Sequence, residues 1–529
     1  MAHRRLPLLA LAAILVGAAA TLPYRHLWEP DEPRYCESAR EMLATGDWLV
    51  PRINGEPYGH KPPLYMWLAA AGRLAGLPWT AAGVVPSLLP FLALLLLLPA
   101  MARDFGLSRP AGGLAAPFLA ASLLAAIMAL AARMDTLLAF LFTVSLWLTA
   151  RLLWGNGRRA LATHLALWLC IALAVLTKGP VVLALFALTL GLAWAVARPR
   201  PALRPVVFGF GPLLAIAVIL AWLIPAALHG GADYLREILI RQSAGRMVAS
   251  FAHQRPFYYH LVTYPITGLP FAVLAFTAAV VALRERRSHP RLLLAAAMIA
   301  VLGFFTLISG KLVVYLLPLF PAAALLAADA VVERHRHVRS GLYAGAAGMV
   351  LVGGVVALAP YGRAELAAVS RLLAVAGGAI AACSVWAFVA LRRQAAPAAV
   401  AARLTVAGLL VPAAVAPIAV HALDQTMHLA TVADAVCGLE PEASDGFVYR
   451  MNVAGPALYT NRIFRQLSTP AQFREVLEAG RAVIVEEKHW QMVHGEMAEL
   501  PVSMTSFPFR TGSVFIVRAA PDQSHDVAR

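Results

Sequence analysis

The sequence predicts a polytopic α-helical membrane protein that ends in a small α/β domain. Of its 529 residues, 60% are hydrophobic and only 14% are charged, whereas soluble chains carry roughly 25% charged residues. Apolar runs of about 18 to 25 residues follow one another, and each is long enough to cross ~30 Å of hydrocarbon. From about Asp424 the composition changes to short strand-like and helix-like segments, which indicates a separate domain.

The apolar runs are the elements of the membrane region. We predict about thirteen transmembrane helices, at residues 6–22, 80–102, 112–132, 136–153, 160–176, 180–197, 206–228, 259–283, 292–308, 312–330, 341–359, 372–391 and 404–421. The alternative for the first run is a cleaved signal peptide, since "MAHRR" resembles its basic start and "GAAAT" its cleavage site. Under both alternatives, the loop that follows lies outside the cytoplasm.

Every second connection between the predicted membrane helices is short and rich in arginine. These connections indicate the orientation of the chain in the membrane. Examples are "ARDFGLSR" at 102–109 and "RERRSHPR" at 284–291, and the positive-inside rule makes them cytoplasmic. The first loop (23–62) and the large loop 229–258 then face the other side. We therefore predict a transmembrane domain over residues 1–423 and an extracytoplasmic α/β domain over 424–529.

Charge and cysteine content argue against a nucleic-acid partner and against a metal site built from cysteines. The formal net charge is +16, but most of the excess lies in cytoplasmic loops and serves orientation, so we predict no nucleic-acid partner. The four cysteines lack the spacing of a metal site, and a disulfide between Cys36 and Cys437 is an open alternative.

The first loop gathers four acids and one arginine in "EPDEPRYCES" at 29–38. Pro33 suits the first turn of a helix. Apolar residues then follow at one-face spacing: Tyr35, Ala39, Met42 and Leu43. This pattern predicts a short amphipathic helix on the membrane surface. Asp31 and Glu32 lie at its N-terminus, where the helix dipole favours ionised carboxylates, and one of them is either a helix cap or a catalytic base.

Lysine is rare in this chain, and most of its lysines occupy one kind of position. Only four of the 44 basic residues are lysine, and three of these lie at predicted extracytoplasmic ends of helices: Lys61 in "GHKPPLY", Lys178 in "LTKGPVV" and Lys311 in "SGKLVVY". Any one alone is explained by a side chain that reaches from the membrane to the interface. Three together favour a cationic pocket that holds an anion.

Arginines on the outer face oppose the positive-inside rule and need another explanation. They are Arg34, Arg40, Arg52, Arg133, Arg241, Arg246 and Arg255, with Asp135 close to Arg133. A guanidinium group binds phosphate oxygens at two points, so these residues predict phosphate recognition, although some can meet lipid headgroups instead.

The residues after 424 predict a compact α/β domain. "GFVYRM", "AVIVEE" and "GSVFIVRA" are typical of strands, while "PAQFREVLEAG" and "KHWQMVHGEMAEL" are typical of amphipathic helices. The segment has no glycine-rich phosphate loop and no metal-spaced His/Cys set. We expect it to gate, dock or stabilise.

The first-loop sequence resembles a known family of membrane glycosyltransferases, which includes the bacterial aminoarabinose transferases of lipid A and the protein O-mannosyltransferases. The likeness lies in "EPDEPRY", "TGDWLVPRINGEPYGHKPPLY", "ARMDTLLAF", "LTKGP" and "SGKLVVYLLPLFP". It implies the C-type glycosyltransferase fold with about thirteen membrane helices. It also implies a multi-pass location in the bacterial inner membrane, with the active site on the periplasmic face.

The resemblance also implies roles for particular residues. Asp31 matches the catalytic acidic position, while Lys61, Lys178, Lys311 and Tyr315 match residues of the polar cavity and the lipid phosphate. Together with the local patterns, this gives the predicted substrate-binding set: Glu32, Arg34, Tyr35, Tyr58, Lys61, Arg133, Asp135, Lys178, Lys311 and Tyr315.

One position departs from the family pattern. The family commonly has Glu before the lysine of "KPP", and this chain has His60. In the aminoarabinose transferase, that glutamate and a loop histidine resembling His253 can hold a metal. His60 and His253 are therefore candidate ligands for a divalent metal such as zinc. No cofactor is expected to be essential, and both zinc dependence and aminoarabinose specificity stay open.

The implied reaction moves a sugar from a polyprenyl phosphate, usually undecaprenyl phosphate, to an extracytoplasmic acceptor with inversion. The lysines and Arg133 would stabilise the departing phosphate, and Asp31 would act as a base toward the acceptor or orient it. The acceptor expected first is lipid A, with protein or another surface glycan as alternatives. A lipid-linked sugar flippase is a further alternative, but the sequence shows no inverted repeat of the kind common in transporters.

Overall fold

The computed structural model describes residues 5–155, 160–238, 255–287 and 289–520. The chain divides into two compact units. The membrane unit comprises Met1–Tyr24, Gly59–Leu68 and Val84–Ala422, and the terminal unit comprises Arg25–Tyr58, Ala69–Gly83 and Leu423–Arg529. The sequence placed most of the first loop within the domain 1–423, whereas in the structure it belongs to the same unit as the C-terminal residues.

The membrane unit is built from helices. Its first half contains α1 (Leu6–Thr21), most of α4 (Trp79–Asp104), α5 (Arg109–Ala121), α6 (Leu123–Ala129), α7 (Asp135–Trp154), α8 (Ala160–Lys178), α9 (Val181–Val196), α10 (Arg204–Val207) and α11 (Phe210–Arg236). Its second half contains α13 (Tyr259–Thr267), α14 (Ala272–Glu285), α15 (Pro290–Leu307), η3 (Val313–Leu319), α16 (Phe320–Val332), α17 (Val338–Gly362), η4 (Ala364–Val369), α18 (Ser370–Arg392), α19 (Pro397–Leu410), η5 (Val411–Val415) and the start of α20 (Ala416–Met427).

The number of membrane-crossing helices differs from the predicted thirteen. Among the described residues, nine helices are long and apolar enough to cross a membrane, or up to eleven if each of two bent pairs is one span. The pairs are α5 with α6, bent by 72°, and α13 with α14, bent by 115°. Two more apolar helices, α1 and α9, have 16 residues each and fall short of that length. The sequence pattern missed both bends because the apolar run continues through them.

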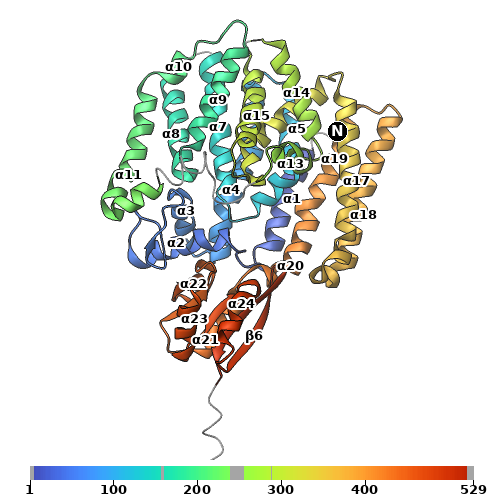
Figure 1. Ribbon diagram of the computed structural model, residues 1–529. Coiled ribbons are helices and arrows are strands. Elements are labelled where there is room, and N and C mark those ends of the chain that lie inside the picture. Colours follow the sequence, from blue (N-terminus) through green and yellow to red (C-terminus); the bar gives the residue numbers. More distant parts are fainter. Residues whose placement is uncertain (1–4, 156–159, 239–254, 288, 521–529) are drawn as a thin grey trace, which may run out of the picture. The chain divides into compact units, whose positions relative to one another are not determined.

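Small residues let the membrane helices pack closely. Gly353 of α17 faces Gly377 of α18, and a Cβ atom on either glycine would overlap the backbone of the other helix. Figure 1 shows these two helices side by side. Between helices in lipid, close packing supplies much of the association that the hydrophobic effect supplies in water, so glycine at this contact has a packing role.

The C-terminal part of the terminal unit is a five-stranded sheet in the order β4-β3-β5-β7-β6. The strands are β3 (Asp445–Tyr449), β4 (Ile463–Leu467), β5 (Val483–Glu486), β6 (Val502–Phe509) and β7 (Gly512–Ala519). β3 is parallel to β4 and β5, and β7 is antiparallel to β5 and β6. The three strands and two helices expected from sequence are present, while β4 and β6 were not predicted.

Helices cover both faces of this sheet. They are α21 (Ala430–Leu439), α22 (Ala454–Thr460), α23 (Pro470–Glu478) and α24 (Glu487–Val493), the last followed by η6 (His494–Met497). Strand residues alternate between two cores: Val448 and Ile484 pack with α21 and α22, while Tyr449 and Val485 pack with α23 and α24. This alternation is the two-residue period of a strand, and burial on both sides explains why the central strands are apolar throughout.

The first loop contributes α2 (Asp31–Thr45) and the short hairpin of β1 (Arg52–Ile53) with β2 (Glu56–Pro57), while α3 (Leu64–Leu74) is shared by the two units. The helix begins at Asp31, two residues before Pro33. Its predicted apolar face is buried, but so are Glu32, Glu37 and Glu41. The acidic side of the helix is thus also covered by the protein, where Glu37 pairs with Arg40. Its location at the membrane surface stays a prediction. Cys36 and Cys437 are both free, which excludes the disulfide alternative.

Candidate active site

The membrane unit holds a cluster of charged residues at the start of α7 and the end of α8. Asp135, the first residue of α7, forms an ion pair with Lys178, the last residue of α8. Arg133 Nε lies 3.6 Å from the other oxygen of Asp135, and Lys61 also interacts electrostatically with this carboxylate. Because α7 and α8 are consecutive helices that pack against each other in opposite directions, the start of one meets the end of the other.

An aromatic ring completes the surroundings of Lys178. Its Nζ lies 4.5 Å from the centre of the Tyr315 ring, a cation–π distance. Tyr315 belongs to η3, which packs against α7, and its ring lies 5.2 Å from that of Phe305. One ammonium group therefore touches both a carboxylate and an aromatic face, which fixes its position.

Two hydroxyl groups support the backbone at Arg133. Ser87 Oγ donates to the Arg133 carbonyl oxygen at 2.7 Å, and the Tyr65 hydroxyl contacts Ser87 Oγ at 2.8 Å. Sequence analysis missed both residues, since a lone serine in an apolar helix and a tyrosine among apolar residues carry no distinctive pattern. They hold the segment before α7 in place.

The cluster has more positive than negative charge. Lys61, Lys178 and Arg133 surround one carboxylate, and the side chains of Asp135 and Lys178 are only 4% and 11% exposed. Charges shielded from water interact more strongly than charges at a surface, so the excess positive charge favours an anion such as a phosphate. Asp135 was predicted to bind substrate, and the structure gives it the further role of orienting Lys178.

Lys311 is buried and its ammonium donates to the Ile308 carbonyl oxygen. Within the described parts of the chain, the structure records no direct contact between Lys311 and Lys178. Of the three predicted lysines, Lys178 contacts Asp135 directly and Lys61 interacts with it electrostatically, while Lys311 contacts the backbone of its own turn.

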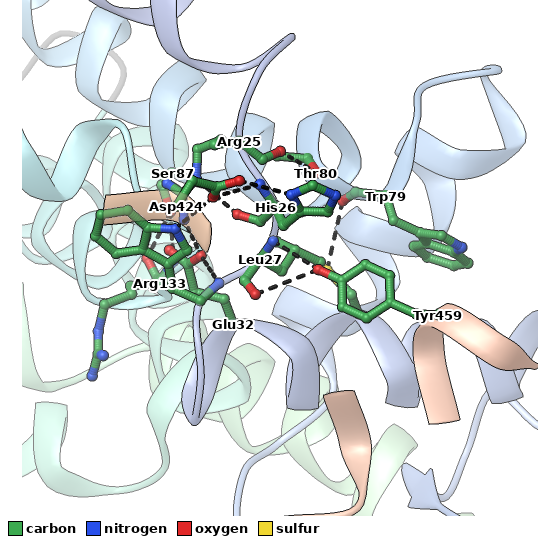
Figure 2. Close-up of polar contacts among 12 residues, drawn as sticks. Arg25, His26, Leu27, Glu32, Trp79, Thr80, Ser87, Arg133, Asp424 and Tyr459 are labelled. Atoms are coloured by element: carbon green, nitrogen blue, oxygen red, sulfur yellow. Dashed lines mark hydrogen bonds and ion pairs between the residues drawn. The ribbon is translucent and has the colours of Figure 1, made fainter. Parts of the chain in front are cut away.

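The acidic loop lies in the terminal unit, and its carboxylates differ in exposure. Asp31 is the first residue of α2, its side chain is 26% exposed, and its Oδ1 lies 3.6 Å from Arg34 Nη1. Glu32 is buried, where it pairs with Arg25 and accepts from the Trp28 backbone N–H at 2.8 Å. Figure 2 shows the Glu32 side chain with Arg25 at the start of this loop. The geometry therefore favours Asp31 over Glu32 for contact with a substrate.

The other predicted residues of the loop are part of its packing. Tyr35 is buried in α2, and the Tyr58 backbone N–H donates to the Pro51 carbonyl at 2.7 Å beside the hairpin. Arg40 forms a two-point pair with Glu37 at 2.7 and 2.8 Å, and Arg52 pairs with Asp47. These two outer-face arginines stabilise the loop itself.

Two buried acids of this loop have shifted pKa values. Burial raises the pKa of Glu29 to about 7, against the opposing effect of a hydrogen bond from Asn452. Burial likewise raises the pKa of Glu37 to about 7, against the effect of Arg40. Neither acid was predicted as a site residue. Asp31 belongs to the terminal unit and Lys61 to the membrane unit, so their predicted proximity stays a prediction.

The candidate metal ligand His60 faces a carboxylate. Its Nε2 lies 3.6 Å from Glu237 Oε1, at the end of α11. Glu237 can approach because residue 59 is glycine, whose added Cβ would lie 2.8 Å from the Glu237 side chain. Imidazole and carboxylate are both zinc ligands, so these residues fit a metal in type. The second predicted ligand, His253, lies outside the described residues, as do Arg241 and Arg246.

Comparisons with known proteins show what the chain as a whole is similar to. Residues 6–235 match the family model described as dolichyl-phosphate-mannose-protein mannosyltransferase. The undecaprenyl phosphate-α-4-amino-4-deoxy-L-arabinose arabinosyl transferase of Pseudomonas aeruginosa is 32% identical over 357 residues, 64% of this chain and 61% of that protein. The corresponding protein of Edwardsiella ictaluri is 33% identical over 324 residues, 59% and 56% of the two chains. The chain thus matches less than two thirds of these relatives' length, and the resemblance seen in the sequence is confirmed.

Solved structures show the fold. The crystal structure of ArnT from Cupriavidus metallidurans bound to undecaprenyl phosphate superposes with a TM-score of 0.78 at 23% identity, over 97% of this chain and 98% of that one. The Archaeoglobus fulgidus oligosaccharyltransferase superposes with a TM-score of 0.56 at 13% identity, over 97% and 74%. The chain therefore has the C-type glycosyltransferase fold. It is a membrane protein that is mostly helical.

Proposed function

We propose that this chain is an inverting glycosyltransferase that moves a sugar from undecaprenyl phosphate, or a related polyprenyl phosphate, to an extracytoplasmic acceptor. Lipid A is the acceptor we favour, because the relatives with 32–33% identity are named as aminoarabinose transferases that use undecaprenyl phosphate. The observation that carries the proposal is the partly buried set of Lys178, Arg133 and Lys61, which interact with the buried carboxylate of Asp135 and whose excess positive charge suits a lipid phosphate.

The reaction follows from the charges that must be stabilised. The bond between the anomeric carbon and the phosphate oxygen breaks, and the phosphate leaves with the electron pair. Lys178, Arg133 and Lys61 would stabilise that charge as it develops. The acceptor oxygen attacks from the opposite face, which inverts the anomeric carbon. Asp31 would take the proton of an acceptor hydroxyl, or orient the acceptor if it is a phosphate that carries no proton.

We also propose the location and the topology. The membrane helices would lie in the bacterial inner membrane with the charged cluster on the periplasmic face, because the arginine-rich connections then face the cytoplasm. Thirteen crossings are reached if each bent pair is one span and α1 and α9 cross as well. A 16-residue helix is about 24 Å long, so α1 and α9 would need help from flanking residues or local thinning of the bilayer.

The test is transfer by the purified protein in nanodiscs, with a labelled undecaprenyl-phosphate sugar and lipid A as the two substrates. We expect labelled lipid A, and the same modification in mass spectra of lipid A from cells with the protein but not from cells without it. Movement of the labelled lipid across the bilayer without transfer would instead identify a flippase.

A protein acceptor is the second candidate, because the matching family model is that of a protein mannosyltransferase. The same preparation can be offered extracted periplasmic protein in place of lipid A. Labelled protein together with unlabelled lipid A would favour this alternative.

We propose that transfer has no essential cofactor and that His60 can help to hold a divalent metal such as zinc. The 3.6 Å contact between His60 and Glu237 supports this proposal, since both groups are metal donors. Such an ion would supply positive charge beside the lysine at position 61. No step of the transfer is assigned to it.

A further inference from the structure

Three potential metal ligands meet in the terminal unit, and none of them is assigned to the transfer. His26 comes from the start of the first loop, Asp424 from the end of α20, and His428 from the turn before α21. His26 Nδ1 lies 2.7 Å from Asp424 Oδ2, and His428 Nε2 lies 3.5 Å from the same oxygen. Each residue offers one possible ligand atom, and these three atoms all lie within 4.8 Å of one another. Figure 2 shows His26 and Asp424 directed at each other.

The carboxylate is held in place by groups other than the two histidines. Asp424 Oδ1 accepts from the His26 backbone N–H and from Trp28 Nε1, both at 2.9 Å. Both hydrogen bonds go to one oxygen, so the other oxygen, Oδ2, is left to face the two imidazole rings. The centres of the two imidazole rings lie 3.9 Å apart.

His428 has an unsatisfied nitrogen that points into this cluster. Its side chain is only 1% exposed, and Nε2 has no hydrogen-bond partner within the described part of the chain. The nearest acceptor is Asp424 Oδ2, whose 3.5 Å distance is long for a hydrogen bond. Two ligand atoms on one tetrahedral zinc ion lie roughly 3.4 Å apart, given bonds near 2.0–2.1 Å. The spacing of His428 and Asp424 therefore fits a shared metal better than a direct hydrogen bond. His26 Nδ1 and Asp424 Oδ2, at 2.7 Å, are hydrogen-bonded and would separate by about 0.7 Å when both bind one ion.

We propose that His26, Asp424 and His428 bind one divalent transition-metal ion of the zinc type, with water as the fourth ligand. His26 is 41% exposed, which leaves a path for the ion and for that water. The softer imidazole nitrogens favour zinc over calcium or magnesium, which take six or more oxygen ligands, and Asp424 is the single carboxylate of the group among the described residues.

The proton positions on the imidazole rings of His26 and His428 determine how much affinity is lost when a metal ion binds. His26 can move its proton to Nε2, because that side of the ring is half-exposed. His428 Nδ1 accepts from the Ala430 backbone N–H at 3.0 Å, so the proton of the neutral ring is on Nε2. Binding moves that proton to Nδ1 and breaks one hydrogen bond, which lowers the affinity by about 10- to 100-fold. The affinity of structural zinc sites in proteins exceeds this loss by many orders of magnitude, so we still expect the ion to bind.

The ion would fasten the first loop to the segment that enters the C-terminal domain. Residues 26 and 428 are 402 positions apart, and the loop continues from His26 through Trp28 to Glu32, which pairs with Arg25. Asp31 lies beside Glu32 at the start of α2. The three ligands are therefore positioning residues, which hold the beginning of the helix that carries the candidate base.

The experiment measures metal content, so it does not depend on the proposed transfer. The full-length protein, purified in detergent without a histidine tag, is stripped with a chelator and then given zinc or cobalt alone. We expect one tightly bound zinc ion for this site, and a cobalt absorption band typical of tetrahedral coordination. In His428→Asn, the amide oxygen can replace Nδ1 as the acceptor for Ala430 while the ligand Nε2 is lost. We expect that variant to bind zinc at least about 100-fold more weakly.

Two further variants guard against misfolding and against a second ion. His26→Asn changes a half-exposed residue and should give the same loss even if His428→Asn fails to fold. His60→Asn should keep the zinc and cobalt signals of this cluster, because residue 60 is not part of it. No bound metal in the wild-type protein, or full metal content and an unchanged cobalt spectrum in both cluster variants, would overturn the proposal. Loss of the signal in His60→Asn alone would assign the ion to the other position.

Discussion

Replacement of Lys178 by methionine separates a role in phosphate binding from a role in packing. Met keeps the apolar stem and removes the ammonium that touches both Asp135 and the Tyr315 ring. If that charge stabilises the leaving phosphate, its loss should cost about 2–4 kcal/mol in the transition state, which is roughly a 30- to 1,000-fold slower transfer.

The contacts of Lys178 predict that this single variant is also less stable than the wild type. Asp135 is 4% exposed and loses its closest cation, although Arg133 at 3.6 Å and Lys61 remain. Removing one partner of a buried ion pair costs up to about 3–5 kcal/mol, and the remaining cations should reduce that figure. A slower Lys178→Met enzyme is therefore not decisive alone.

The double variant Lys178→Met with Asp135→Asn resolves the two effects. The amide removes the stranded charge, so we expect thermal stability to return close to that of the wild type while transfer stays slow. Lys178→Arg should restore transfer only in part, since a planar guanidinium does not occupy the place of a compact ammonium. The assays are single-turnover transfer and thermal unfolding in one nanodisc preparation. Recovery of both stability and rate in the double variant would refute the role of Lys178 in binding phosphate.

Three other predictions follow from particular contacts. Asp31→Asn should fold normally but transfer on the order of 100-fold more slowly, because the amide cannot act as a base; near-normal single-turnover rates would make Asp31 a helix cap. Burial raises the pKa of Glu29 from 4.5 to about 7, so folding takes up a proton and stability falls as pH rises between these values, by at most about 3 kcal/mol. Glu37, whose pKa is also raised to about 7, contributes a similar fall, so Glu29→Gln should remove only the Glu29 part when unfolding is followed from pH 5 to pH 8; an unchanged pH profile would contradict the assignment. Gly353→Leu should lower the unfolding temperature, because its side chain would collide with α18 at Gly377; Gly354→Leu, at a position with open space, is the matched control.

The membrane helices show which structural features a local sequence pattern can predict. The predicted run 372–391 corresponds to α18 (Ser370–Arg392), and 136–153 corresponds to α7 (Asp135–Trp154). Such agreement is expected, since the thickness of the hydrocarbon sets the length of every apolar run independently of its neighbours. The bend between α5 and α6 was not predictable in the same way. Ser122 adopts an extended conformation in the middle of one continuous apolar run, and only packing selects it.

The charged residues show which structural features a local sequence pattern cannot predict. Sequence analysis singled out Asp31 and Glu32 as equivalent candidates, and the structure separates them because Arg25 and the Trp28 backbone engage Glu32. The predicted α2 helix was correct in existence and in its acidic first turn. Its burial on the acidic side was missed, since that burial depends on partners outside the helix.

The sequence by itself determined the membrane class, the approximate helices, the acidic loop and the unusual lysines, because composition and local period express these features directly. The tertiary structure decided which charges meet. Lys178 pairs with Asp135 across 43 positions, and His26 meets Asp424 across 398 positions. Neither contact leaves a mark in local sequence, because a buried charge takes its partner from whichever helix end the fold brings beside it. The candidate phosphate cluster and the proposed metal cluster are therefore products of helix packing.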